Sequence, residues 1–153
     1  MDHLSISVPC ELRFRDSVGA LIQHVCQHLE QEGAEPGLGY QVVSAFNEAF
    51  NNLVQYAYEP TQPGVVEVHL ELTPTQIAVE LRDTGRTFDF QAVESPNLTE
   101  LPESGLGIFI IRSFMTDVTY RPAAGDGQPN QLRMIRTLGD RSGHAAQGTN
   151  SDA

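Results

Sequence analysis

Apolar residues recur at every second position in some segments of the chain and at every third or fourth position in others. The first pattern is typical of strands that bury one face, and the second is typical of amphipathic helices. Glycine and proline separate these segments and predict the turns between them. The sequence therefore predicts helices at 17–32, 40–58 and 108–115, and strands at 4–8, 11–14, 66–72, 77–83, 118–121 and 131–138.

The N-terminal region leaves an alternative open. Leu4–Val8 and Glu11–Phe14 flank Pro9, so they predict either two short strands or one strand with an interruption. The helix that follows has Asp16 or Ser17 as its expected N-cap.

The order of the elements predicts the fold class. A turn at 73–76, which contains Pro74, joins two alternating strands into an antiparallel hairpin. Helices and antiparallel strands in this order predict an α+β protein, a two-layer α/β sandwich with helices on one face of a mixed, mostly antiparallel sheet. We expect one domain at 1–138, with a lid at 84–104 because that long segment lacks periodicity, and a disordered polar tail at 139–153.

Charge and composition exclude several classes of protein. The 153 residues carry 20 acidic and 9 basic side chains, and a formal charge of -11 disfavours direct binding of nucleic acid. Lysine is missing from the sequence, which excludes a phosphate-loop lysine and a Schiff-base lysine. No apolar run approaches the ~20 residues of a membrane helix, and no signal peptide is visible, so we expect a cytoplasmic protein. Cys10 and Cys26 are expected to be reduced and buried.

The helix predicted at 40–58 has an unusual polar half. An ordinary solvated face is the simplest interpretation, but such faces are normally built from Glu, Lys and Arg, whereas this one holds three asparagines, which are weaker helix formers. Glu48 and Asn52 are four residues apart and therefore lie on adjacent turns, where both can contact one ligand. The polar half comprises Ser44, Asn47, Glu48, Asn51, Asn52 and Gln55.

Two further features fit either a structural or a functional role. Asp83 shares the parity of Leu81, so its carboxylate faces the core at the end of a strand; it either caps the turn that follows or accepts a hydrogen bond from a ligand amine. Gly105 and Gly107 precede an apolar helix and either provide flexibility or let a phosphate approach backbone amides.

Taken together, three segments resemble the N, G1 and G2 boxes of the GHKL (Bergerat-fold) ATPases, and in particular the anti-sigma factor serine/threonine protein kinases. The resemblance covers nearly the whole chain. Its segments are Asn47–Tyr58 (NEAFNNLVQYAY), Leu81–Gly85 (LRDTG) and Gly105–Met115 (GLGIFIIRSFM).

The resemblance implies a role for each site residue, with ATP or ADP and Mg²⁺ as cofactors. Glu48 would be the general base toward a protein serine hydroxyl, and Asn52 would be the Mg²⁺ ligand. Asp83 would accept a hydrogen bond from the adenine amino group, and Gly85 would permit close approach of the base. The phosphates would be lined by Gly105, Leu106 and Gly107.

The same resemblance implies partners and an activity. It implies an anti-sigma factor that binds a sigma factor, phosphorylates an anti-anti-sigma protein with a STAS domain, and forms a homodimer. Three departures from the family pattern predict slow transfer. Thr87 replaces the second glycine of the G1 box, Tyr56 replaces a histidine, and Glu103 and Ser104 occupy the place of an arginine that contacts the terminal phosphate, unless Arg86 substitutes for it.

Two other functions remain open at this stage. One is a protein-interaction module that binds nucleotide and performs no chemistry. The other is a metal protein that uses His24, Cys26 and His28, although Cys26 points away from the helix face that the two histidines share.

Overall fold

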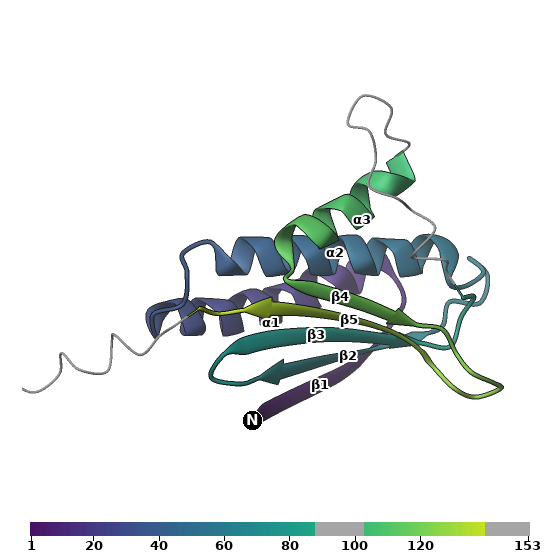
Figure 1. Cartoon of the computed structure of the whole chain (residues 1–153). Helices are drawn as coiled ribbons and strands as arrows, with labels where there is room; N and C mark the ends of the chain where they lie inside the picture. Colours follow the sequence, from purple (N-terminus) through teal and green to yellow (C-terminus); the bar gives the residue numbers. More distant parts are fainter. Residues whose placement is uncertain (88–102, 140–153) are drawn as a thin grey trace, which may run out of the picture.

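The structure is a computed structural model that describes residues 1–87 and 103–139. A single antiparallel sheet has the strand order β1-β2-β3-β5-β4, and the helices lie on one of its faces (Figure 1). The α+β two-layer fold is therefore confirmed, and every pairing among the described strands is antiparallel. The elements are β1 (Asp2–Pro9), α1 (Leu12–Gln31), α2 (Leu38–Tyr56), β2 (Val65–Leu72), β3 (Gln76–Asp83), α3 (Glu103–Phe114), β4 (Asp117–Arg121) and β5 (Asn130–Thr137).

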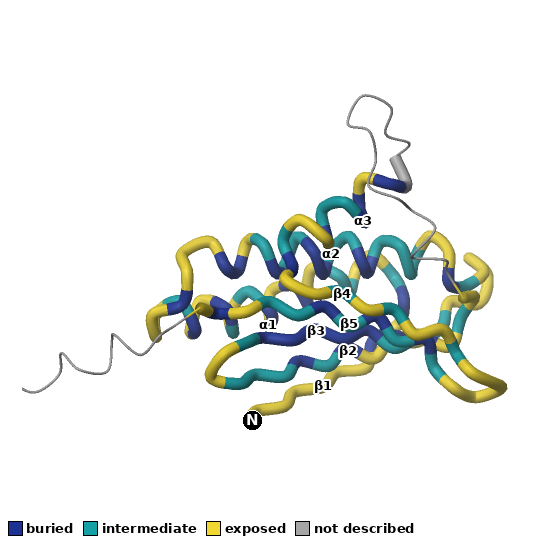
Figure 2. Tube along the Cα trace, viewed as in Figure 1, coloured by how far each residue is buried: buried dark blue, intermediate teal, exposed yellow. Residues whose placement is uncertain are grey.

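The hairpin of β2 and β3 forms the centre of the sheet. Its register places Val68 opposite Leu81 and Val66 opposite Asp83, and all four side chains are buried. Figure 2 shows that β3 is buried along nearly its whole length, whereas the edge strand β1 is mostly exposed. The alternation in the sequence therefore correctly predicted which face of the hairpin is buried, including the carboxylate of Asp83 at the end of β3.

The prediction of a strand at 11–14 is wrong. Residue Glu11 is the N-cap of α1, and Phe14 packs against the core from the first turn of that helix. Phe14 and Val18 are four residues apart, so they extend the apolar stripe of the helix toward the N-terminus. Asp16 accordingly lies inside the helix instead of capping it.

Helix α3 begins earlier than predicted. It starts at Glu103, so Gly105 and Gly107 lie in its first turns and not in a loop before it. Ile108 and Ile111 are fully buried and attach the helix to the core.

The remaining expectations concern the two cysteines, the predicted lid and tail, and membrane-spanning helices. Cys10 and Cys26 are free and buried, as predicted, and burial raises the pKa of the two thiols to about 11 and about 12. Apart from its ends, the predicted lid at 84–104 lies outside the described residues, as does the tail beyond Gly139. Within the described ranges, no helix combines the length and the apolar character needed to cross a membrane.

Candidate functional site

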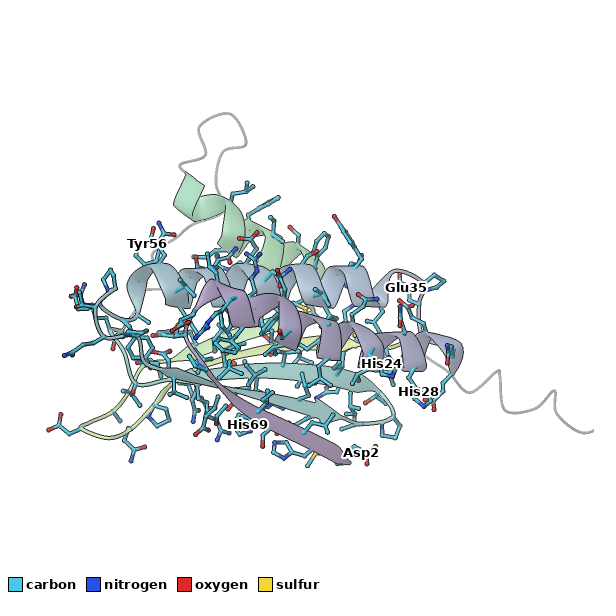
Figure 3. The ribbon with its side chains drawn as sticks, turned by 180° about the vertical axis from the view of Figure 1, so that it is seen from behind. Asp2, His24, His28, Glu35, Tyr56 and His69 are labelled. Carbon is cyan, nitrogen blue, oxygen red and sulfur yellow. The ribbon has the colours of Figure 1, made fainter. Side chains whose placement is uncertain are left out.

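A small cleft opens between the C-terminal half of α2 and the sheet. Asp83 at the end of β3 and Asn52 on α2 contribute polar groups to its walls. Tyr56, at the opposite end of α2 from Glu35 (Figure 3), also lines it. Most of the remaining lining is apolar and comes from Ala49, Leu53, Ala57, Tyr120 and Leu132. Flat apolar walls with a few directed polar groups suit a planar ligand that carries hydrogen-bonding edges.

Asp83 is the buried acid of this cleft, with only 4% of its surface exposed. Its Oδ1 accepts hydrogen bonds from the backbone N–H of Gly85 at 2.9 Å and from Nδ2 of Asn130 at 3.1 Å. Burial raises the pKa of Asp83 above its ordinary value, and these two hydrogen bonds act in the opposite direction. Its Oδ2 accepts no hydrogen bond from the described residues, so it is the acceptor still available to a ligand.

Asn130 is a site residue that the sequence analysis missed. It is fully buried at the start of β5, directly opposite Asp83 in the register of the two strands. In the sequence it follows Pro129 at the end of a glycine-rich turn, where asparagine is an ordinary turn residue. Only the pairing of β3 with β5 reveals its contact with Asp83.

The chain beyond Asp83 is fixed against the end of α2. Gly85 lies so close to Ala57 that an added Cβ would collide with the Ala57 carbonyl, and the Arg86 N–H donates to that same oxygen at 2.8 Å. The Tyr58 hydroxyl accepts a hydrogen bond from the Thr84 N–H at 2.9 Å. The structure therefore gives Gly85 a packing role, in addition to the predicted close approach of a base.

The polar half of α2 is divided between two neighbouring helices. On the side of α1, Nη1 of Arg15 donates to Oδ1 of Asn51 at 2.7 Å, and Asn47 packs near Gly19. On the side of α3, Glu48 packs against the backbone of that helix. All of these side chains are at least partly covered, so the interpretation as an ordinary solvated face is wrong for this part of α2.

Glu48 and the start of α3 meet at Gly107. A Cβ added to Gly107 would lie 2.8 Å from Oε2 of Glu48, so glycine makes room for the carboxylate there. Gly105 is buried, while Leu106 is exposed. A helix that begins at Glu103 leaves the N–H groups of its first turn, that of Gly105 among them, without helical partners.

Thr87, one of the departures from the family pattern, and Arg86, the possible substitute for the missing arginine, both have partners in the structure. Arg86, proposed as a substitute phosphate ligand, forms an ion pair with Glu59 at the mouth of the cleft. Oγ1 of Thr87 donates to Oδ1 of Asn130 at 3.3 Å. The side chains of residues 103 and 104 lie outside the described part of the structure.

The alternative metal site does not assemble. His24 and His28 are exposed along α1 (Figure 3), whereas Cys26 is fully buried in the core. Among residues 1–87 and 103–139, no group of three or more His, Cys, Asp or Glu side chains is arranged to hold a metal ion.

An antiparallel sheet with helices on one face and an apolar cleft that ends at a buried carboxylate are the features of a two-layer domain of the Bergerat type. Comparison with known families agrees. The histidine kinase-like ATPase domain family matches residues 14–136, and the chain belongs to this family.

Individual relatives are consistent with this assignment. The chain is 32% identical over 90 residues to the serine-protein kinase RsbW of Staphylococcus aureus strains RF122 and MRSA252, a match that covers 53% of this chain and 57% of the relative. The chain thus spans a little over half the length of these curated relatives.

Two solved structures share the fold. The RsbU and RsbW domains of a Mycobacterium tuberculosis protein superpose with a TM-score of 0.61 at 16% identity, covering 90% of this chain and 33% of that one. The SiaB–SiaC complex of Pseudomonas aeruginosa gives a TM-score of 0.62 at 15% identity, covering 88% and 89%.

The contact of Gly85 with α2 predicts a local destabilisation. We expect Gly85→Ala to lower the free energy of unfolding by roughly 1 to 3 kcal/mol, because the new methyl group meets a backbone carbonyl that cannot move independently. Gly125→Ala is the matched control, since a Cβ at Gly125 meets nothing within 4 Å. Urea denaturation of both variants tests this, and equal stabilities would contradict it.

The environment of Asp83 predicts that Asp83→Asn weakens nucleotide binding without lowering the stability of the protein. In Asp83→Asn the amide oxygen keeps both contacts of Oδ1, while an NH₂ donor replaces Oδ2. We expect adenine nucleotides to bind more than about tenfold more weakly, because a hydrogen bond to a charged acceptor is lost. Isothermal titration calorimetry measures the affinity.

The same variant should not lose stability at neutral pH. Because the pKa of Asp83 is raised in the folded protein, the folded state disfavours the ionised carboxyl, and a neutral amide avoids that cost. The variant's advantage over the wild type should diminish as the pH falls and Asp83 becomes protonated. A variant that unfolds more readily than the wild type at pH 7 would contradict this account.

Proposed function

We propose that the chain is an ATP- and Mg²⁺-dependent serine/threonine protein kinase that acts as an anti-sigma regulatory factor. One observation carries the proposal: Oδ2 of the buried Asp83 accepts no hydrogen bond from the described residues and lies at an apolar cleft that also includes Asn52, and Glu48 lies one turn earlier on α2. A bound nucleotide would place its base at Asp83, its phosphates near Asn52 and the reacting hydroxyl of the substrate near Glu48.

The base-binding end fits adenine. The exocyclic amine of adenine donates hydrogen bonds, and Asp83 supplies an acceptor that burial keeps away from competing water. The surrounding side chains of Ala49, Leu53 and Leu132 present apolar surface to a flat ring.

The phosphate end fits a nucleotide bound with a divalent cation. The sequence contains no lysine, so neutralisation of the phosphates depends on arginine or on a cation. Asn52 would provide an amide oxygen as a ligand of Mg²⁺, and the backbone at the N-terminus of α3, which includes Gly105, would meet the phosphates. When bound, Mg²⁺ would neutralise charge that develops on the phosphates during transfer.

Glu48 is the proposed general base. It is partly buried, and Gly107 leaves space for its carboxylate beside α3. In this position it would accept the proton of a serine hydroxyl as the phosphoryl group is transferred. Asn52, on the adjacent turn, would orient the nucleotide.

The proposed partners follow from the relatives and from the sequence resemblance. RsbW of Staphylococcus aureus is named a serine-protein kinase, and SiaB was solved in complex with SiaC. We propose that this chain binds a sigma factor and phosphorylates a STAS-type anti-anti-sigma protein, and that it acts as a homodimer in the cytoplasm.

A second function is a nucleotide-binding interaction module without kinase activity. The ion pair between Arg86 and Glu59 favours it, because Arg86 would have to leave Glu59 in order to contact a phosphate. Without such a cation the charge on the transferring group is less well stabilised.

The two functions are separated by a transfer assay. The protein is incubated with Mg²⁺, ATP labelled on the terminal phosphate and a purified STAS-domain protein encoded nearby. We expect labelled phosphoserine on that partner and none when EDTA removes the cation. Nucleotide binding without any labelled partner would favour the interaction module.

The role of Glu48 predicts a loss of rate without a loss of binding. Glu48→Gln keeps the shape of the side chain but cannot accept a proton, so we expect phosphoryl transfer to fall by about 10² or more while ATP affinity stays near that of the wild type. Ser44→Ala, one turn earlier on α2, is the matched control, because among the described residues its hydroxyl bonds only to the Tyr40 carbonyl. A normal transfer rate in Glu48→Gln would exclude this residue as the base.

A further inference from the structure

Asn130 lies where a turn leads into β5, and its side chain makes more hydrogen bonds than such a position requires. Its side chain is fully buried, and all four of its hydrogen-bonding positions are used. Nδ2 donates to Oδ1 of Asp83 at 3.1 Å and to the carbonyl of Gly85 at 3.0 Å. Oδ1 accepts from the N–H of Ala123 at 2.9 Å and from the hydroxyl of Thr87 at 3.3 Å.

The orientation of this amide is determined by two backbone groups. The N–H of Ala123 can only donate, so it must face the amide oxygen, and the carbonyl of Gly85 can only accept, so it must face the NH₂ group. A flipped side chain would lose both contacts inside the protein. The atom that faces Asp83 is therefore a donor.

This donor controls which oxygen of Asp83 a ligand can use. Oδ1 already accepts from Gly85 and from Asn130, and these two bonds use its acceptor positions. The carboxylate thus keeps a fixed rotation, with Oδ2 as its available acceptor.

We propose that Asn130 is a positioning residue that determines the base selectivity of the cleft, an inference that rests on the proposed nucleotide-binding function. By donating to Oδ1 it keeps Asp83 an acceptor, so that the cleft selects a base with an exocyclic amine over a base with a carbonyl at the same place. Burial raises the pKa of Asp83, and the hydrogen bond from Asn130 acts against that rise, in the direction that favours the ionised carboxyl.

The side chain of Asn130 also provides a structural reason for a threonine at position 87. The Thr87 hydroxyl and the Gly85 carbonyl both bond to Asn130, which also accepts from Ala123 in the connection between β4 and β5. Asn130 therefore links the segment that follows β3 to the loop between β4 and β5. A glycine at position 87 could not make this contact.

Measurement of base selectivity tests the proposal. Dissociation constants for ADP and for inosine diphosphate, whose base has a carbonyl where adenine has its exocyclic amine, are measured on the same samples by calorimetry. We expect the wild type to prefer ADP by about tenfold or more. In Asn130→Asp the two facing carboxyls hold a proton between them at Oδ1, which lowers the charge on Asp83 and makes Oδ2 a weaker acceptor, so the preference should fall about tenfold.

Gln131→Asp is the matched control. It adds the same charge at the next residue of β5, on the opposite face of the sheet, and should keep the wild-type preference. Asn130→Ala, which removes the donor without adding a charge, provides a second variant if Asn130→Asp does not fold, and should shift the preference in the same direction. A merely structural role would weaken both nucleotides equally and leave their ratio unchanged.

The outcomes separate this inference from the proposed function. A wild type that binds neither nucleotide overturns both. A wild type that prefers ADP, together with folded Asn130 variants of unchanged preference, overturns the role of Asn130 and leaves nucleotide binding intact.

Discussion

A carboxylate buried at the end of a central strand must find donors inside the protein, and this requirement organises the site. Asp83 obtains one donor from the tight turn at Gly85 and the other from Asn130 across the strand pair. The turn is possible only because Gly85 packs directly on Ala57. The sheet register, the end of α2 and the rim of the cleft are therefore coupled through one acid, of which one oxygen remains available.

The second constraint is the position of α2 between two helices. Arg15 of α1 bonds to Asn51, and α3 approaches Glu48 closely enough that a Cβ at position 107 would displace the Glu48 carboxylate. The costly asparagines of this helix thus serve two purposes. Asn51 links α2 to α1, whereas Asn52 lines the cleft.

Much of the fold and part of the site follow from local patterns. Alternation along β3 correctly placed Asp83 in the core, and helical spacing correctly placed Glu48 and Asn52 on adjacent turns. The start of α1 was mistaken for a strand because a short apolar run fits either period. The glycines of α3 were placed before the helix because glycine normally interrupts one.

The sequence by itself determined the periodicities, the buried acid and the motifs that identify the family, since each of these depends on residues close together in the chain. Only the tertiary structure decided which polar groups meet. Asn130 and Asp83 are 47 residues apart, and Arg15 and Asn51 are 36 apart. Such contacts depend on strand register and helix packing, which arise from the burial of the whole core and leave no periodic signal at either residue.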